Sequence, residues 1–501
     1  MLARVKKFGE RETPLRISPE ELELFSGRKR EINLADDPEK GYDLYVIKDF
    51  MPLTKRPGDL ALGLMRIRRE VGSEPLLYCA GAGELNAIAP LAYAGVDLFD
   101  SIECVRKSRD HELMESSFAS TSSSLLFEEL FDQNLERVET ELELVRIAIE
   151  NGSIRELAEA RSIYGSSLNV FVRSIDREYS TMESFSPTAS KDVLKALSSY
   201  SLSRAEFERY RRRVTAVYRK PEHADTMLIL PCSARKPYSL SKSHRLFAEN
   251  TLNRRALHEV IITSPLALVP RELELFFPCS NYDIHVSHQW YEDEKAMIRR
   301  TLADFIEKND YRRAIVHFDE PFFTDVLEER GIEVTRTCVS DPRSEESLRS
   351  LREVTGSIGA KSRGIMEDMK SAALFQFGLD IFEGCYATGK YPYVKLMRDK
   401  RQLAMLNPER GFFSLTLDGA KALHEMTNVF DVEIDFDPEG KGSIFVPGIK
   451  NASQDIREGD EVCITKDGEF IGVGVAEMCG IDMNESKSGI GVKVRHLASL
   501  A

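Results

Sequence analysis

The middle of the chain, from about Leu202 to Thr355, alternates short β-branched runs with helical stretches. The runs are TMLILPCS, EVIITSP, YDIHVS, RRAIVHF and IEVTRTC, and YEDEKAMIRRTLADFIEKND predicts a long helix. Strands that alternate with helices of about ten to twenty residues predict a doubly wound, mostly parallel sheet. Ligands of such sheets bind beyond the carboxyl ends of the strands. The loop that leaves the buried strand TMLIL is therefore expected to belong to a functional site.

That loop concentrates reactive side chains. LPCSARKPYSLSKSHRLF, from Leu230 to Phe247, holds a thiol, basic groups, a phenol, four serine hydroxyls and an imidazole. A cysteine that follows a strand and precedes a helix beside basic groups is expected to have a lowered thiol pKa. A histidine there is expected to move a proton near neutral pH. The candidate catalytic residues are Cys232, Lys236, Tyr238, Ser241 and His244.

These residues also have structural interpretations. A cysteine after a buried strand is often a small apolar core residue. Ser233 and Arg235 are predicted to bind substrate, although Arg235 and Lys236 would look the same in a solvated basic loop. The tyrosine either stacks on a base or lies in the core, and the histidine is either an acid–base group or a satisfied structural residue. Serines before SHRLFAEN are expected to cap a helix; they are Ser239, Ser241 and Ser243.

Composition limits the class of protein. The chain has 501 residues, of which 42% are hydrophobic, and a net charge of −14. No apolar run reaches the roughly 20 residues that span a bilayer, and MLARVKKFGE lacks the apolar stretch of a signal peptide, so we expect a cytoplasmic protein. Any nucleic-acid surface must be local, as in KLMRDKR, where Lys395 and Arg398 are candidate RNA-binding residues.

Metal and cofactor motifs are not evident. The eight cysteines include no CxxC pair, which argues against a disulfide framework and a compact zinc site. In HVSHQWYEDE, His285 and His288 have a ligand-like spacing but no third ligand at a convincing distance, so we expect a strand end and no metal. No phosphate-binding P-loop motif occurs, and no cofactor is expected.

The chain is predicted to be a multidomain α/β protein. The first part includes a helical hairpin that breaks at Asn151-Gly152, and STMESFSPTASKD is interpreted as a linker. Closely spaced strands at the end, SIFVPGI, DEVCITKD, GEFIGVGVAEM and GIGVKVRH, predict a β-barrel with a turn at Asp467-Gly468. The predicted domains are residues 1–190, the central α/β domain 195–355, a small α+β domain 360–425, and the barrel 426–501.

The barrel resembles a PUA domain, an RNA-binding module of tRNA- and rRNA-modifying proteins. Four motifs occur in the family's order: VPGI, IREGDEV, GEFIGVGVA and VKVRH. The resemblance implies docking on structured tRNA, with Gly448 and Lys450 as contacts. Lys450 would meet a phosphate, which positions RNA without specifying its sequence. The other interpretation is an ordinary barrel turn without RNA.

The amino-terminal domain resembles a degenerate archaeal tRNA-guanine transglycosylase, best in LLYCAGAGELNAIAPLAYAGVDLFDS. Asp100 matches the aspartate of the family's FDS motif, which attacks the ribose. The family's early DSGGF stretch is missing, and its zinc ligands are replaced by FASTSSS and by Gln133 in FDQNL. Base exchange and zinc are therefore not expected, and Asp100 is interpreted as a structural residue or a substrate-binding one.

With the central loop, the chain resembles archaeosine synthase over nearly its whole length. The resemblance implies an enzyme that acts on 7-cyano-7-deazaguanine at position 15, in the D-arm of archaeal tRNA. It adds an amine donor, expected to be free lysine, to the nitrile and forms an amidine adduct, which a radical-SAM partner enzyme cleaves. A homodimer is one expected state, because relatives often pair subunits. The family's PC-x3-KPY-x2-S-x2-H signature is matched by Pro231, Cys232, Lys236, Pro237, Tyr238, Ser241 and His244.

This chemistry requires activation, because a lysine amine with a pKa of about 10.4 is almost wholly protonated at neutral pH. In one route a base deprotonates the bound ammonium while an acid protonates the nitrile nitrogen. In the other, Cys232 adds first and the amine displaces it from a thioimidate. His288 or Glu292 is a candidate for binding the amine. Asp319 or Glu320 is a candidate for pairing with its cation, unless the pair caps a helix.

Two other functions stay open at this point. A non-catalytic subunit would hold tRNA with the barrel and the degenerate first domain for another enzyme, but the reactive loop would then be unexplained. A transglycosylase would exchange the base itself, but the zinc ligands are missing.

Overall fold

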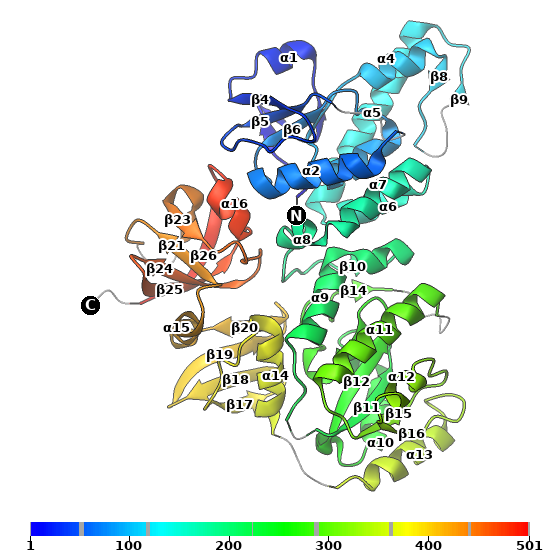
Figure 1. The fold of residues 1–501 in the computed structure, drawn as a ribbon, viewed down its shortest axis with the longest axis vertical. Helices are drawn as coiled ribbons and strands as arrows, with labels where there is room; N and C mark the ends of the chain where they lie inside the picture. Colours follow the sequence, from blue (N-terminus) through cyan, green and yellow to red (C-terminus); the bar gives the residue numbers. More distant parts are fainter. Residues whose placement is uncertain are drawn as a thin grey trace. The chain divides into compact units, whose positions relative to one another are not determined.

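The computed structural model describes residues 2–49, 55–116, 121–222, 224–284, 290–359, 364–438 and 442–498. They form two compact units, whose helices and strands are labelled in Figure 1. The first joins residues 1–187 to 429–495, and the second comprises residues 188–428 with 496–501. Within the described ranges, no helix combines the length and apolar character that a membrane crossing requires.

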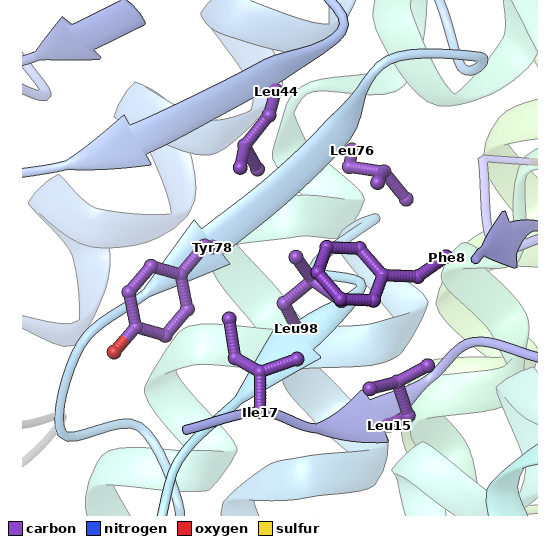
Figure 2. Packing of buried hydrophobic residues seen from close by; sticks show 7 residues of the cluster. All are labelled: Phe8, Leu15, Ile17, Leu44, Leu76, Tyr78 and Leu98. Carbon is purple, nitrogen blue, oxygen red and sulfur yellow. The ribbon is translucent and has the colours of Figure 1, made fainter. Parts of the chain in front are cut away.

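A five-stranded parallel sheet lies at the centre of the first unit. Its order is β3 (Leu15–Arg16), β7 (Leu98–Phe99), β6 (Leu76–Cys79), β5 (Leu44–Ile47) and β4 (Lys29–Ile32). Apolar side chains from four of these strands and from the segments beside β3 pack into one cluster, which is buried from water and stabilises the short strands. Figure 2 shows its members: Phe8, Leu15, Ile17, Leu44, Leu76, Tyr78 and Leu98.

Helices connect and follow the strands of this sheet and pack against one another. They are α2 (Pro57–Val71), α3 (Ile88–Tyr93), α4 (Ile102–Arg109), α5 (Phe127–Glu150), α6 (Ile154–Ser162), α7 (Ser166–Arg177) and α8 (Tyr179–Ser184). The predicted helical hairpin is confirmed, since α5 and α6 are separated at Asn151-Gly152 and pack together. Gly152 has φ 66°, in the left-handed region that glycine adopts without a Cβ clash.

The carboxyl-terminal barrel belongs to the first unit. Its strand order is β22 (Ser443–Phe445), β26 (Ile490–Leu497), β25 (Glu469–Ala476), β24 (Glu461–Lys466), β21 (Asp431–Ile434) and β23 (Ile449–Ala452). The predicted turn is confirmed: Asp467 and Gly468 have φ 50° and 79° between β24 and β25. In α16 (Gly480–Glu485), the buried Asp482 carboxylate accepts hydrogen bonds from Ser73 N at 2.7 Å and Ser73 Oγ at 2.6 Å. This contact ties the barrel to the segment that precedes β6.

The second unit contains the predicted doubly wound sheet. Its order is β13 (Ala267–Pro270), β12 (Leu257–Thr263), β11 (Thr226–Pro231), β15 (Arg313–Val316) and β16 (Glu333–Arg336), and only β13 is antiparallel to its neighbour. Its helices are α9 (Ala205–Ala216), α10 (Lys242–Asn250), α11 (Glu292–Lys308), α12 (Thr324–Glu328) and α13 (Glu345–Gly356). From β11 the chain passes to β12, toward one edge of the sheet, and from β15 it passes to β16, toward the opposite edge. Right-handed crossovers then put α10 and α12 on opposite faces.

One predicted strand does not join this sheet. Among the described residues of YDIHVS, Tyr282–Asp283 form a strand, β14, which pairs with β10 (Leu194–Lys195); residues 285–289 lie outside the described ranges. The physical reason is that β13 already pairs with β12 and occupies that edge. β13 was not predicted from the sequence; it turns back from β12 after Ser264-Pro265.

The rest of the second unit is a small α+β domain. An antiparallel sheet has the order β17 (Tyr386–Lys390), β18 (Tyr393–Arg398), β19 (Arg401–Asn407) and β20 (Phe412–Leu415). Two helices, α14 (Ile365–Phe377) and α15 (Leu417–Met426), pack against it (Figure 1).

Candidate functional site

A cavity of about 490 Å³ opens at the carboxyl ends of β11, β15 and β16. Because β11 is the strand at which the sheet order reverses, this is the switch point where doubly wound folds bind ligands. The cavity is lined by Pro231, Cys232, Ser233, Ala234, Ser243, Phe247, Asp319, Ser340, Asp341, Pro342 and Arg343. The loop after TMLIL therefore borders the cavity, at the position expected from the sequence.

Cys232, the candidate nucleophile, lines this cavity, but its thiol is not activated by the loop. Burial raises the pKa of Cys232, and it outweighs the opposing effects of the Lys236 charge and of hydrogen bonding to Thr263. The expected lowering of this pKa is therefore wrong. A further reason is that α10 begins only at Lys242, so its amino terminus is not next to the thiol.

Lys236 lies near Cys232 and over an aromatic ring. Its Nζ is 4.0 Å from the ring centroid of Tyr282, in a cation–π contact. Burial lowers the pKa of Lys236, while the charges of Cys232 and Asp283 oppose that change. The lysine is thus partly desolvated and is not a freely solvated surface group.

Tyr238 occupies the core. Its side chain is fully buried, and its hydroxyl hydrogen-bonds to the Tyr282 hydroxyl, which lies 2.7 Å from Thr263 Oγ1. The interpretation in which Tyr238 stacks on a base does not fit this position. Burial raises its pKa well above the usual value. Tyr238 therefore anchors the loop to the protein core.

The serines of the loop have structural partners. Ser241 is the N-cap of α10, because its Oγ accepts a hydrogen bond from His244 N at 3.2 Å. Ser233 Oγ donates to the Arg235 carbonyl at 3.0 Å, and the Arg235 side chain is exposed. The helix-cap interpretation is confirmed for Ser241. The predicted substrate contacts of Ser233 and Arg235 stay predictions.

His244 is buried beside Arg271. Arg271 Nη2 donates to His244 Nδ1 at 2.8 Å. Burial, and secondly the Arg271 charge, lower the pKa of His244 to about 3. The expectation that this histidine titrates near neutral pH is therefore wrong. Its assignment as a catalytic residue stays a prediction.

Arg271 and Glu274, which were not predicted as site residues, organise this side of the loop. Arg271 Nε donates to Glu259 at 2.7 Å, and Arg271 Nη1 donates to Glu274 at 2.9 Å. Glu274 also accepts from Ser239 N at 2.9 Å and from the Tyr391 hydroxyl at 3.3 Å. Arg271 and Glu274 both lie near the end of TSPLALVPRELE, so the sequence shows their charges. Their proximity to the loop depends on the β12–β13 hairpin.

Two acidic candidates lie after β15. Asp319 lines the cavity and Glu320 is exposed beside it. The helix-cap interpretation is wrong, because α12 starts after Phe323 and has no side-chain cap. Glu292 is the first residue of α11 and pairs with Lys295 at 2.8 Å. His288, with the rest of the histidine pair, lies outside the described residues; elsewhere in the described ranges, no cluster of three metal-ligating side chains is found.

Asp100 lies in the first unit, and its carboxylate is held by internal donors. Oδ2 accepts from the Tyr78 hydroxyl at 2.8 Å and from Gly81 N at 2.7 Å, and Oδ1 accepts from Ile102 N at 2.9 Å. The residue is 5% exposed. These contacts favour the structural interpretation over a substrate-binding role.

The candidate RNA contacts differ in their surroundings. Lys450 is exposed and pairs with Glu433 at 3.1 Å, and a Cβ on Gly448 would lie 2.5 Å from the Phe436 ring, so a side chain there would displace this ring. Lys395 is exposed on β18. Arg398 donates to the carbonyls of Ile381 and Glu383 at 3.0 and 2.7 Å, which makes it a structural residue in this fold.

Family models match three parts of the chain. A domain of unknown function (DUF5591) matches residues 207–355, the patch-forming domain C2 of tRNA-guanine transglycosylase matches residues 369–429, and the PUA domain matches residues 435–498. The last two matches and the α/β fold define an RNA-binding protein of the tRNA-modifying class.

Curated relatives identify the family. The archaeosine synthase of Haloferax volcanii is 32% identical over 92% of this chain and 83% of its own length. The archaeosine synthase subunit alpha of Methanosarcina acetivorans is 32% identical over 91% and 80%, and that of Thermoplasma acidophilum is 32% identical over 90% and 88%. The chain belongs to the archaeosine synthase family.

Proposed function

We propose that this chain is a tRNA-modifying enzyme of archaeosine biosynthesis. It adds an amine, expected to be free lysine, to the nitrile of 7-cyano-7-deazaguanine at position 15 of tRNA. The observation that supports the proposal is a cysteine, Cys232, in a cavity of about 490 Å³ at the switch point of the central sheet of an archaeosine synthase family member. The amidine adduct would then be the substrate of a radical-SAM partner enzyme.

Cys232 and Lys236 supply the nucleophile and a proton carrier in this proposal. Burial raises the thiol pKa and lowers the ammonium pKa, so the two values move toward each other and proton transfer between the groups becomes easier. Lys236 acts as its neutral amine, the form that burial favours; the thiol proton passes to Nζ, and Sγ bonds to the nitrile carbon. Lys236 then protonates the nitrile nitrogen, which gives a thioimidate.

The second half of the reaction returns the enzyme to its starting state. The donor's ammonium first passes a proton to Lys236 Nζ, which is neutral again after it has protonated the nitrile nitrogen. The amine nitrogen then bonds to the thioimidate carbon, the carbon–sulfur bond breaks, and Lys236 gives the proton that it holds to the amidine. The proton that the amine loses goes to the departing sulfur, so the products are an amidine and the Cys232 thiol. No oxidant, reductant or nucleotide is consumed.

The cavity lining suits a free amino acid as donor. Asp319 offers a carboxylate for an ammonium group, and Arg343 offers a guanidinium, which pairs well with a carboxylate in two parallel hydrogen bonds. Arg343 is held by Asp341 at 3.1 Å. The carboxylate of a bound amino acid would replace Asp341 as the partner of Arg343, and its ammonium group would pair with Asp319.

The test uses the full chain and tRNA that carries 7-cyano-7-deazaguanine. It is incubated with isotopically labelled lysine, and with labelled glutamine or ammonium in parallel, and the nucleosides are analysed by mass spectrometry. We expect a nucleoside heavier by one whole lysine. An unchanged nucleoside despite tight tRNA binding would overturn the proposal and favour a tRNA-holding subunit.

Matched cysteine variants separate the two chemical routes. Cys232→Ala is expected to lose the adduct while it still binds tRNA, and Cys385→Ala, at another partly buried cysteine of the same unit, is expected to keep it. Adduct formation by Cys232→Ala at an unchanged rate would contradict the covalent route and leave direct addition of the amine.

A further inference from the structure

His317 contacts the wall of the candidate cavity from the protein interior. It follows β15 directly, its side chain is fully buried, and its backbone N–H donates to the Ile229 carbonyl of β11 at 3.0 Å. The imidazole meets the ring of Phe247 edge-on, with the ring centroids 5.1 Å apart. Phe247 lines the cavity, so His317 packs directly behind a residue of the candidate site.

The two ring nitrogens of His317 have different partners. Nε2 lies 2.8 Å from the Pro342 carbonyl oxygen, and Nδ1 lies 2.9 Å from Thr337 Oγ1. A carbonyl oxygen can only accept, so the imidazole proton is on Nε2, and Nδ1 accepts from the threonine hydroxyl. Burial lowers the pKa of His317, which favours this neutral form. His317 thus links the end of β15 to the segment that follows β16.

That segment carries the guanidinium of the cavity. We call residues 337–343 the wall segment. The Arg343 side chain is 64% exposed, and Asp341 of the same segment holds both its guanidinium and its backbone N–H. Val339 N donates to Ser347 Oγ on α13 at 3.0 Å, which ties one part of the wall segment to that helix. The members of the wall segment that line the cavity are Ser340, Asp341, Pro342 and Arg343.

We propose that His317 is a positioning residue for the carboxylate of the amine donor. It acts through the Pro342 carbonyl on the neighbouring Arg343 and does not touch the donor itself. Because this hydrogen bond holds the backbone in place, Arg343 presents its guanidinium to the cavity before the donor arrives, and less freedom is lost when the carboxylate binds. The inference rests on the proposed function for the identity of the donor as an amino acid.

The test measures KM and kcat for lysine with the full chain and tRNA that carries 7-cyano-7-deazaguanine. His317→Phe keeps a ring against Phe247 but loses both hydrogen bonds. It is expected to raise the KM for lysine about tenfold, the effect of one lost hydrogen bond, and to leave kcat nearly unchanged. His317→Gln keeps a donor for the Pro342 carbonyl and an acceptor for Thr337 Oγ1, and is expected to restore the KM.

A double-mutant cycle with Arg343→Gln separates positioning from a general structural role. If His317 acts through Arg343, adding His317→Phe to Arg343→Gln should raise the KM for lysine no further. The control is Arg349→Gln, at an exposed arginine of α13 that pairs with Glu345, and it should leave the KM unchanged. Circular dichroism checks the fold of each variant. If His317→Phe does not fold, Thr337→Val takes its place, because it removes the hydroxyl that orients the imidazole, and it should raise the KM by a smaller factor.

Calorimetry measures lysine binding without reaction, in the presence of tRNA that carries guanine in place of the nitrile base. A chain that forms no adduct, but whose lysine affinity falls in His317→Phe and recovers in His317→Gln, refutes the proposed function alone. An unchanged KM in His317→Phe would overturn the inference, and so would full additivity with Arg343→Gln. Absence of lysine binding by the unchanged chain would overturn it as well.

Discussion

Arg271 donates a hydrogen bond from Nη2 to Nδ1 of His244 at 2.8 Å. A guanidinium has no acceptor, so His244 Nδ1 must be unprotonated and the imidazole proton must be on Nε2. Glu259 and Glu274 hold the remaining edges of the guanidinium, which fixes the direction of this donor. His244 is therefore a neutral imidazole of one tautomer, next to the loop that carries Cys232.

The first prediction concerns pH. The pKa of His244 is lowered to about 3, whereas a histidine in the unfolded chain titrates near 6.5. Below about pH 6.5 the unfolded state binds a proton that the folded state does not, so stability falls as pH falls, by up to about 1.4 kcal/mol per pH unit. His244→Phe should remove this slope. Urea unfolding at pH values from about 4.5 to about 8, on both sides of the ordinary histidine pKa, measures how the free energy of unfolding changes with pH.

Nitrogen NMR of the imidazole provides the control. The Nδ1 signal of His244 should stay that of an unprotonated nitrogen throughout this range. Arg271→Met should raise the His244 pKa, because it removes the nearby positive charge. A His244 that gains a proton near neutral pH in the unchanged chain would contradict the assignment.

The second prediction concerns the Cys232 thiol. Because burial raises its pKa, alkylation by iodoacetamide should be slow at neutral pH and accelerate as pH rises. Lys236→Met removes the charge that lowers this pKa, so alkylation at a given pH should slow further. Peptide mapping by mass spectrometry, with Cys385 as the internal reference, measures both rates. Faster alkylation in Lys236→Met would show that the lysine does not stabilise the thiolate.

The third prediction concerns the contact between the barrel and the first sheet. Asp482→Ala leaves Ser73 N and Ser73 Oγ without their buried acceptor, at a cost of about 1–3 kcal/mol for each group. Glu485→Ala, on the same helix, removes the exposed ion pair with Lys40 and should cost below about 1 kcal/mol. Urea unfolding followed by circular dichroism compares the variants. Equal losses in the free energy of unfolding would mean that the buried Asp482 contacts stabilise the unit no more than the exposed Glu485–Lys40 ion pair does.

The fourth prediction concerns Asp100. Its three donors make it a structural group, so Asp100→Asn should reduce the free energy of unfolding but leave lysine-adduct formation within a few-fold of the unchanged chain. Circular dichroism and the mass-spectrometric adduct assay are made on the same sample. Abolished adduct formation in a folded Asp100→Asn protein would assign this aspartate a chemical role.

The sequence could predict the elements whose signals are local. The alternation around TMLIL and EVIITSP predicted the parallel sheet, and the Asp467-Gly468 dipeptide predicted a barrel turn, because backbone conformation and side-chain periodicity depend on near neighbours. The chemistry of the loop after β11 was also readable, since residue types and spacing are printed in the chain. These signals were enough to locate the candidate site at the end of one strand.

Only the tertiary structure decided what the environment does to those residues. Desolvation by distant segments raises the Cys232 pKa and lowers that of His244, in both cases against the sequence expectation. Arg271 and Glu274 reach the loop because the β12–β13 hairpin folds back, and Tyr391 joins them from another domain. Burial and long-range hydrogen bonding depend on which segments meet in space, so no local pattern specifies them. The sequence therefore determined which reactive groups this protein has, and packing determined their protonation and their partners.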